Sequence, residues 1–295
     1  MSDHPIEPGI YDMPDEEYFA FPAFSNSDLK LISRSPAHYW NEKRNPNREV
    51  KESTPAMQAG TAYHCAILEP EAFADRYIMA PATAPKKPTA AQWNAKKPSA
   101  AGIESMEWWT EFNDKAGDRI ILSADDYEMY LAVGGKIRKH PELEKLLSDG
   151  LAEKCVFAED PETGLLVKCK TDYYRQFTDL NVITDLKTTQ DARPFAFQRD
   201  AYKFGYFQQA AFYSDVWKWA DIVDEIHTWI ITAFERDAPH AVKLYEVSGA
   251  DIEFGRKQYR KALNTAAECH ATDTWPAYDT EITPLHIPGY ASVDD

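Results

Sequence analysis

Two predicted strands, residues 165–174 and 182–188, constrain the fold of this chain more than any other feature. Both are rich in β-branched and aromatic residues, and the short polar segment between them can reverse the chain. Side chains alternate faces along a strand, so Asp185 and Lys187 share one side of the second strand. If the two strands pair, Asp172 on the first strand converges with Asp185 beside the lysine. Two carboxylates and an ammonium group at one place are typical of a site for a hard metal ion.

The spacing of these residues resembles the core hairpin of the PD-(D/E)XK nuclease superfamily, with Asp172, Asp185 and Lys187 at its three motif positions. An Asp-x-Lys tripeptide alone is common on the solvent face of strands, so the second aspartate and the motifs described below carry the resemblance. The proline of the family pattern is absent, because Thr171 precedes Asp172. The resemblance implies an α/β fold of the restriction-endonuclease type, with a mixed central β-sheet flanked by helices.

A histidine upstream of the hairpin extends the resemblance. Residues 56–68 predict a helix that is rich in small side chains, ends before Pro70 and contains His64. A lone histidine on such a helix is most often a core residue. RecB-type nucleases, however, place a Gly-x-x-x-His segment before the catalytic hairpin, and Gly60 stands four residues before His64. The resemblance therefore implies that His64 is an additional metal ligand.

The segment around residue 30 carries another part of the pattern. Ser25 or Ser27 can cap an amphipathic helix, and Pro36 either closes that helix or starts another. On its own this is an ordinary capped helix. A similar Ser-Pro segment also opens RecB-like and RecE-like members of the superfamily.

Downstream of the hairpin we predict one long helix, from about residue 197 to residue 219. Gln209 and Tyr213 lie four residues apart on it, which places them on one helix face. Gln-x-x-x-Tyr at this distance after Asp-x-Lys is a signature of the RecB family. The resemblance implies that the two residues position the substrate or Lys187.

Together the motifs resemble the RecE-like branch, the exonuclease VIII type found with phage recombination systems. The resemblance implies a Mg²⁺-dependent exonuclease, with Mn²⁺ as a substitute, which digests double-stranded DNA from its ends in the 5′ to 3′ direction. Asp172, Asp185 and the backbone carbonyl of Leu186 would hold one or two ions, with His64 as a further ligand and Lys187 orienting water. We expect Asp185 and Lys187 on a solvent-exposed, concave face of the sheet.

By the same resemblance the protein acts in homologous recombination or single-strand annealing, in the cytoplasm of a bacterial or phage-infected cell. It further implies a ring-shaped homo-oligomer and a single-strand-annealing partner. The alternative is a catalytically inactive module of the same fold, which binds DNA or serves in assembly. The formal net charge of −16 suits this alternative, since nucleic-acid binders usually show a basic face. The presence of every motif residue argues against it.

An acidic protein must confine its DNA contacts to a narrow track, because charges are screened over roughly 10 Å at ordinary salt. Residues 79–102 are rich in Pro and Ala, contain no acidic residue and predict a mobile, solvent-exposed loop. We expect this loop to contact DNA through four lysines and one tryptophan: Lys86, Lys87, Lys96, Lys97 and Trp93. Two more basic surfaces are expected, on the strand with Lys168 and Lys170 and on the helix with Arg256, Lys257, Arg260 and Lys261.

The remaining pattern is consistent with one nuclease domain over residues 1–295, with an N-terminal lead-in (1–24) and an extended, surface-packed C-terminal tail (273–295). Further helices are expected at 104–115, 123–137, 141–147 and 250–272, and further strands at 152–157, 225–234 and 241–247. Glu153, in the first of these strands, lies where a further superfamily carboxylate can stand. The sequence does not place it, so it is not included in the expected site.

Several classes of protein are excluded by composition. No run of 18 or more apolar residues occurs, so we expect no membrane span. The N-terminus has neither a basic region nor an apolar stretch, which argues against a secretory signal. The four cysteines are scattered without a Cys-x-x-Cys pair, which predicts reduced thiols and no zinc or iron–sulfur cluster.

Overall fold

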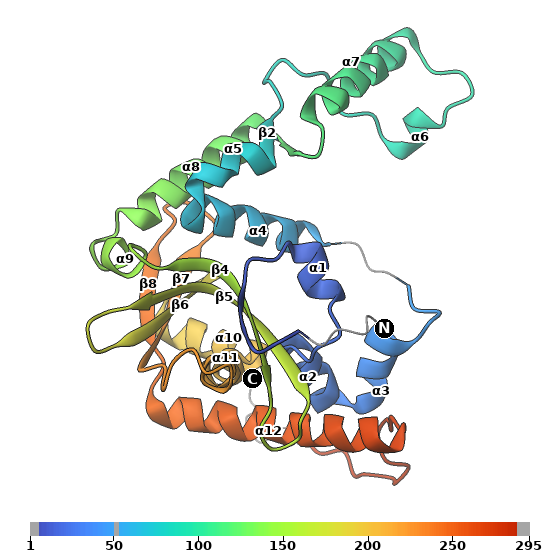
Figure 1. Cartoon of the computed structure of the whole chain (residues 1–295). Helices are drawn as coiled ribbons and strands as arrows, with labels where there is room; N and C mark the ends of the chain where they lie inside the picture. Colours follow the sequence, from blue (N-terminus) through green and yellow to red (C-terminus); the bar gives the residue numbers. More distant parts are fainter. Residues whose placement is uncertain (1–5, 50–52, 288–295) are drawn as a thin grey trace.

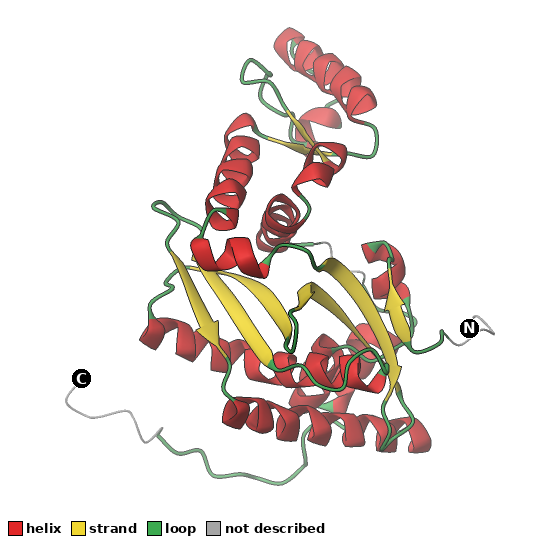
Figure 2. Cartoon of the chain, turned by 60° about the vertical axis from the view of Figure 1, so that its left-hand side comes forward, coloured by secondary structure: helices red, strands yellow, loops and turns green. Residues whose placement is uncertain are grey.

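The computed structural model describes residues 6–49 and 53–287. Its centre is a six-stranded mixed sheet in the order β1-β4-β5-β6-β7-β8, with helices on both faces (Figures 1 and 2). The predicted mixed central sheet flanked by helices is therefore confirmed. The strands are β1 (Gly9–Tyr11), β4 (Leu151–Glu159), β5 (Leu166–Gln176), β6 (Asn181–Thr189), β7 (Thr228–Glu235) and β8 (Val242–Glu246).

The strand pairing divides the sheet into two regions joined at β6. The pairs β1–β4, β4–β5, β5–β6 and β7–β8 are antiparallel, and the last three join strands that are consecutive in the chain through short connections. The pair β6–β7 is parallel and needs a crossover connection, which α10 (Pro194–Phe204) and α11 (Tyr206–Trp219) supply. The crossover packs α11 against β4 and β5 and places its first turn over Asp185 and Lys187 of β6.

One face of the sheet is covered by α11, α12 (Gly249–Thr272) and α2 (Asn26–Arg34), and it holds the larger hydrophobic core. Trp217 of α11 is fully buried there, its ring centroid 4.2 Å from that of Tyr174. The indole N–H of Trp217 donates a hydrogen bond of 2.8 Å to the hydroxyl of Thr171 on β5. This bond satisfies a polar group that would otherwise be costly to bury.

The other face is covered by α4 (Pro55–Leu68) and α8 (Ala124–Arg138), which share the second core. The two helices approach closely at Gly134, where an added Cβ would lie 2.6 Å from the carbonyl oxygen of Ala66. This close approach holds α4 against α8, and both helices share the second core with the sheet. Helix α4 carries His64, so its position fixes one residue of the expected site.

The chain between β2 (Tyr77–Met79) and β3 (Ile120–Leu122) forms an arm that projects away from the sheet (Figure 1). The arm, residues 77–122, contains α6 (Ala90–Trp93) and α7 (Ala100–Ala116) around a small core of Ala80, Trp109 and Phe112. Residues 79–102, expected as a loop, thus contain one helical turn, capped by Thr89, and the start of α7, capped by Ser99.

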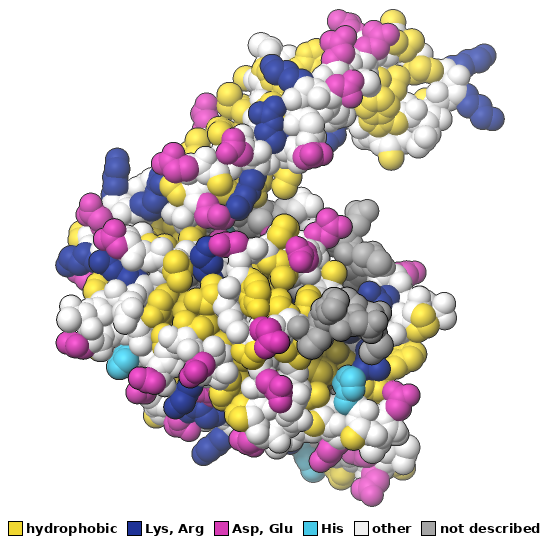
Figure 3. Space-filling view, in the orientation of Figure 1, with side chains coloured by type: hydrophobic (Ala, Val, Ile, Leu, Met, Phe, Trp, Pro, Cys, Tyr) yellow, Lys and Arg dark blue, Asp and Glu magenta, His cyan; other side chains and the backbone are white. Residues whose placement is uncertain are grey.

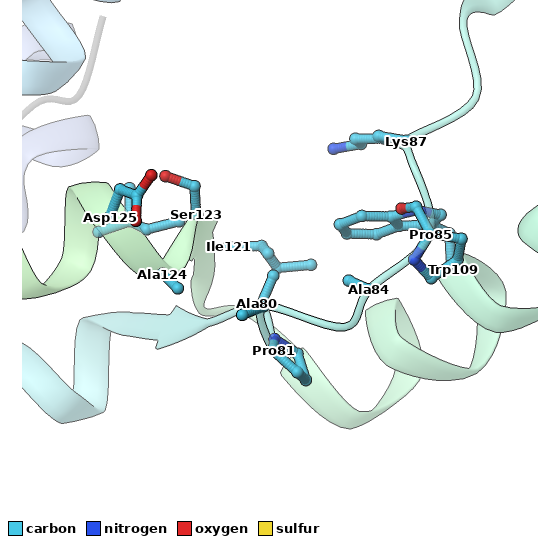
Figure 4. Close-up of a pocket in the computed structure, with 12 residues that line it drawn as sticks. Ala80, Pro81, Ala84, Pro85, Lys87, Trp109, Ile121, Ser123, Ala124 and Asp125 are labelled. Carbon is cyan, nitrogen blue, oxygen red and sulfur yellow. The ribbon is translucent and has the colours of Figure 1, made fainter.

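A pocket of about 470 Å³ lies where the arm meets α8 (Figure 4). The indole N–H of Trp109 donates to the carbonyl of Pro85 at 2.9 Å, which holds the arm's basic segment on its core. The ammonium of Lys87 lies 5.4 Å from the centroid of the Trp109 ring, at the pocket wall opposite Asp125. Lys87 therefore has a partner within the arm.

The predicted single helix from 197 to 219 is wrong. Gly205 adopts a left-handed conformation with φ of 68° and ends α10, and α11 begins at the next residue. The helix predicted after Ser25 is present as α2, with a capping box between Ser25 and Asp28, and Pro36 starts a new helix. The shorter elements are α1 (Asp15–Ala20), α3 (Pro36–Tyr39), η1 (Trp40–Arg44), η2 (Pro70–Ala72), α5 (Phe73–Arg76) and α9 (Pro141–Leu146).

The two terminal segments contact the body of the protein to different extents. The lead-in contributes the edge strand β1 and α1, and residues 1–5 of it lie outside the described residues. The C-terminal tail packs on α3 through Trp275 and Tyr278, but Ile282, Leu285 and Ile287 are exposed. Surface packing is thus limited to the start of the tail, and residues 288–295 are outside the described part. Within the described ranges, no helix combines the length and apolarity needed to cross a bilayer.

Candidate active site

The candidate site lies where β5 and β6 separate. The two strands pair over four residue pairs only, from Gln176 opposite Asn181 to Tyr173 opposite Thr184. Beyond this point β6 continues along β7, while β5 continues along β4. The carboxylate of Asp172 accepts a hydrogen bond of 2.7 Å from the backbone N–H of Leu186, where a bond between the strands would otherwise form. The separation of the strands thus fixes Asp172 between them.

Three potential metal ligands meet at this point. His64 on α4 places its Nδ1 3.5 Å from Oε1 of Glu153 on β4 and 3.7 Å from Oδ1 of Asp172. One ligand atom from each of the three residues lies within 4.8 Å of the others. Glu153 stands opposite Asp172, between the pairs Ala152–Tyr173 and Lys154–Thr171 of the β4–β5 ladder, and has a φ of 52°. A left-handed conformation is costly for a residue other than glycine, and such strain is concentrated at functional sites.

The donor set fits a divalent cation. Oε1 of Glu153 is buried and has no hydrogen-bond partner among the described residues. This oxygen has the His64 imidazole near it, at 3.5 Å, and a second carboxylate lies beside it, which is an arrangement that can bind a cation. Two carboxylates with one imidazole are ligands accepted by Mn²⁺ and related ions, and the oxygens alone suit Mg²⁺.

A second group of three residues lies beside the first. Asp185 on β6 forms an ion pair of 2.6 Å with Lys187, and its other oxygen accepts a hydrogen bond of 2.7 Å from the side chain of Gln209 on α11. Asp185 is only 2% exposed. The expected solvent-exposed position of Asp185 and Lys187 is therefore wrong, because α11 covers this face of β6. The ammonium of Lys187 also lies 5.0 Å from the ring centroid of Tyr206.

The charges of the two groups are coupled. Burial raises the pKa of Asp172 to about 6, against the attraction of His64 and with the repulsion of Asp185. Burial opposes protonation of His64, but Asp172 and Glu153 outweigh it and raise its pKa to about 9. Burial disfavours ionised Glu153, but His64 and Lys170 outweigh it and lower its pKa to about 2. The protonated imidazole of His64 thus balances the negative charge of Asp172 and Glu153, at the place where a bound metal ion would do so.

The remaining expected site residues lie close by. Tyr213 lines the same cleft as Gln209, His64 and Asp172, so the two α11 residues do share a face toward the site. Burial raises the pKa of Tyr213 well above its ordinary value, so its hydroxyl stays protonated. Leu186 contributes its backbone N–H to Asp172, while its side chain is buried in the second core.

Glu153 and Lys170 are the site residues that the sequence analysis omitted. The ammonium of Lys170 lies 2.9 Å from Oε2 of Glu153 and also pairs with Asp15 of α1. The signal that could have located Glu153 is the turn between β4 and β5, where Glu159 faces Leu166. Counting back along both strands from this turn places Glu153 opposite Asp172.

Of the two further basic surfaces that were expected, the one on the strand is wrong and the one on the helix is reduced, because charges in both have internal partners. Lys168 is buried and donates to the carbonyls of Tyr18 and Phe21 at 2.5 and 2.7 Å. Lys170 is part of the site. On α12, Arg256 pairs with Asp215 and Arg260 pairs with Asp160, so two of the four expected charges face acidic groups of the fold.

The expected DNA-contacting residues lie apart from the site. None of the described residues that line the cleft belongs to the arm. The arm is separated from the body by a deep notch and has basic side chains at its free end (Figure 3). Trp93 on α6 is exposed. The structure thus places the expected DNA-contacting segment on a projection, away from the metal donors.

Comparison with known proteins identifies the family to which the chain belongs. Residues 25–284 match the model of the PDDEXK-like domain of unknown function (DUF3799). A crystal structure from Eubacterium rectale, of a protein provisionally named as an exonuclease, is similar with a TM-score of 0.58 and 13% identity, and the match covers 94% of this chain and 96% of that chain. The crystal structure of SSO0001 matches at a TM-score of 0.26 and 12% identity, over 53% of this chain and 69% of that one. No protein of curated function matches in sequence.

The Eubacterium rectale structure supports the fold across nearly the full length of both chains, and at this identity it supports the fold alone. The family match spans the whole candidate site, from the cap of α2 to the tail beyond α12. The resemblance of the motifs to the PD-(D/E)XK superfamily is therefore confirmed at the level of the fold. The chain belongs to the PDDEXK-like domain family DUF3799.

Proposed function

We propose that this protein is a metal-dependent nuclease that degrades DNA from its ends. The observation that carries the proposal is the meeting of His64, Glu153 and Asp172 at the point where the sheet opens, next to the buried pair of Asp185 and Lys187. Membership of a PDDEXK-like family supports nuclease activity. The provisional name of the Eubacterium rectale protein is consistent with exonuclease activity.

The three clustered side chains would hold the metal ion. A bound divalent cation polarises a phosphodiester and lowers the pKa of bound water. The chain's own residues do the rest. Burial opposes the charged form of Lys187, but Asp185 and Asp172 outweigh it and raise its pKa, so its ammonium stays positive to neutralise phosphate charge. Gln209 holds the carboxylate of Asp185 in place for this pair.

Asp185 and the carbonyl of Leu186 remain proposed ligands for the ion. Both oxygens of Asp185 already have partners, Lys187 and Gln209, so ligation by Asp185 would exchange one of these contacts for the metal. Mg²⁺ is the proposed ion, with Mn²⁺ as a substitute, because hard oxygen donors predominate. Tyr213 is proposed to position the substrate, since it lines the cleft with Gln209.

The finer features of the proposal rest on the resemblance of the motifs to RecE-like exonucleases. They are digestion in the 5′ to 3′ direction, a role in recombination with a single-strand-annealing partner, a ring-shaped homo-oligomer and a cytoplasmic location. The arm adds a physical argument for DNA binding, since four of its lysines lie in one segment of a projection that can reach a duplex held outside the cleft: Lys86, Lys87, Lys96 and Lys97.

Nucleotide release from two DNA substrates tests the proposal. Linear duplex and covalently closed circles of the same sequence are incubated with the protein and Mg²⁺ at equal salt, with a chelator control. We expect release from the linear DNA only, and none with the chelator. Equal cutting of the circle would indicate an endonuclease at the same metal site. Binding of DNA without any release in Mg²⁺ or Mn²⁺ would indicate an inactive DNA-binding module.

A further inference from the structure

The cleft that contains the metal donors has two exposed apolar side chains at its opening. It has a volume of about 420 Å³, within the range of roughly 300–1,000 Å³ typical of small-molecule pockets. His64, Glu153 and Asp172 line it together with Phe19 on α1 and Met57 on α4. A cleft of this volume suits a single nucleotide rather than a base pair. We therefore expect the strand that enters it to be unpaired there.

Phe19 is exposed at this mouth although it is aromatic. It is 69% exposed, and Met57 is 62% exposed. Its neighbour Tyr18 turns into the protein and packs against Phe157, so Phe19, one position further round the helix, points outward. A large apolar side chain next to a polar site is informative when it lines a cavity, since such groups commonly mark binding surfaces.

Helix α1 is held rigidly, so Phe19 has a fixed place. Lys168 of β5 donates to the carbonyls of Tyr18 and Phe21 at the end of the helix. Lys170 of the same strand pairs with Asp15 in its first turn. Two lysines of one strand thus fix both ends of α1, and Lys170 also contacts Glu153 of the site.

Charge alone gives an incoming strand little affinity for this cleft. Its charged lining residues are four acids and three bases: Asp15, Glu69, Glu153, Asp172, His64, Arg76 and Lys170. Each base already has an acidic partner, since Arg76 pairs with Glu69, Lys170 with Glu153, and His64 with Glu153 and Asp172. Among the described residues that line the cleft, no basic side chain is therefore left for a phosphate. Contact with the base of the nucleotide would add affinity that these side chains do not give to the phosphates.

We propose that Phe19 is a stacking platform for the base of an unpaired nucleotide in the cleft. This inference rests on the proposed nuclease function and specifies its substrate at the site, a single-stranded end. Every base has an aromatic face, so stacking on a phenyl ring holds any of the four bases without reading sequence. Specificity for an unpaired end thus arises at the mouth of the cleft, and the metal donors below act on the backbone.

A double-mutant cycle between protein and DNA tests the inference. Affinity is measured by fluorescence anisotropy, in Ca²⁺, for single-stranded oligonucleotides whose terminal nucleotide is natural or abasic, at each end in turn. We expect Phe19→Ala to weaken binding of the natural oligonucleotide roughly 5- to 150-fold, the range of one lost stacking contact. On the oligonucleotide that is abasic at the end entering the cleft, Phe19→Ala has little effect, because the stacking partner is already absent.

Two further variants make the test specific to an aromatic face. Phe19→Trp is expected to retain the wild-type affinity, and Phe19→Leu to lose most of the stacking contribution while keeping an apolar side chain. Phe195→Ala is the matched control, since Phe195 is 76% exposed on α10 and does not line the cleft. Circular dichroism confirms folding of each variant. All three substitutions of Phe19 change an exposed side chain, so the fold should be retained.

The inference is overturned if Phe19→Ala binds the natural oligonucleotide as wild type does, or if its loss is equal on natural and abasic DNA. It is also overturned if the wild-type protein binds neither oligonucleotide. The nuclease proposal fails separately, if the wild type releases no nucleotide in Mg²⁺ or Mn²⁺. In that case the binding cycle still decides whether Phe19 stacks on a base.

Discussion

Asp185 and Lys187 form an ion pair of 2.6 Å on a covered face of the sheet, with Gln209 bound to the second oxygen of the aspartate. Both side chains are largely removed from solvent, and Asp185 almost completely. A buried ion pair is kept stable only when its hydrogen bonds are complete, and removal of one partner leaves an uncompensated charge. The pair therefore contributes to both the proposed chemistry and the fold.

We predict that Asp185→Ala abolishes DNA cleavage and also lowers the free energy of unfolding, by about 3–5 kcal/mol, because Lys187 is left buried and unpaired. Asp185→Asn should be less destabilising, since its side-chain oxygen can still accept the hydrogen bond from Gln209. Denaturant unfolding and nucleotide release measure the two effects.

Asp191→Ala is the matched control, because Asp191 pairs with Arg193 on the surface. Its effect on stability should be small, as exposed ion pairs contribute little. If Asp185→Ala is as stable as this control, the pair is not effectively buried. Near-normal cleavage by Asp185→Ala would show that the site is assigned to the wrong residues.

The contact between α4 and α8 gives a prediction about stability alone. An added Cβ at Gly134 would lie 2.6 Å from the carbonyl oxygen of Ala66, whereas at Gly135 it would meet nothing within 4 Å. Gly134→Ala should therefore destabilise the protein by roughly 1–3 kcal/mol through overpacking. Gly135→Ala, in the same helix, should stabilise it by about 0.4–1 kcal/mol. Thermal unfolding of the pair tests this, and equal effects of the two substitutions would contradict the close packing.

Much of the sheet could be predicted from the sequence, because alternation of side chains reports directly on strands. The strands β5 and β6 agree with their predicted ranges to within about two residues, and Asp172 lies next to β6 as expected. The break between α10 and α11 was missed. The helical pattern continues on both sides of Gly205, and a glycine inside a helix is not distinguishable by sequence from one in a left-handed turn.

The partners of charged residues could not be predicted, since they come from elements far apart in the chain. In the sequence Arg256 and Arg260 form a basic helix face. In the structure they form ion pairs with Asp215 and Asp160, which belong to other elements of the fold. The burial of Asp185 depends in the same way on where α11 packs. The position of Glu153 in the site could be found only from the register of β4 against β5, because its sequence neighbours do not indicate it. The local sequence pattern predicts the helices and strands, whereas the site depends on how these elements pack together.

Glu153, although absent from the sequence motif, is expected to be essential for metal binding. We predict that Glu153→Gln weakens binding of Mn²⁺ and Mg²⁺ and lowers nucleotide release, because it removes the charge of the orphaned oxygen between His64 and Asp172. The measurement is the increase in melting temperature on titration with the metal, which reports binding to the folded state. Glu159→Gln, an exposed position on the same strand, is the control. An unchanged metal response in Glu153→Gln would exclude this residue as a ligand.

The pKa of His64 predicts how stability depends on pH when divalent cations are removed. Because its folded-state pKa is raised to about 9 from the ordinary 6.5, protonated His64 contributes stability that is full below pH 6.5 and lost as the pH rises through 9. The loss is at most about 3 kcal/mol, at 1.36 kcal/mol for each unit of pKa.

The neighbouring carboxylates do not obscure this window. The pKa of Asp172 is raised to about 6, so most of its unfavourable ionisation is complete by pH 7 and adds only a small decline between pH 6 and pH 7. The pKa of Glu153 is lowered to about 2, so its favourable contribution is full above pH 4.5 and lost only as the pH falls toward 2.

Urea unfolding in chelator at pH 6, 7.5 and 9 should thus show a decline in the free energy of unfolding for the wild type and a flatter profile for His64→Gln. His286→Gln, in the exposed tail, should follow the wild type. A decline of equal size in His64→Gln would mean that the histidine is not held as a cation by Asp172 and Glu153.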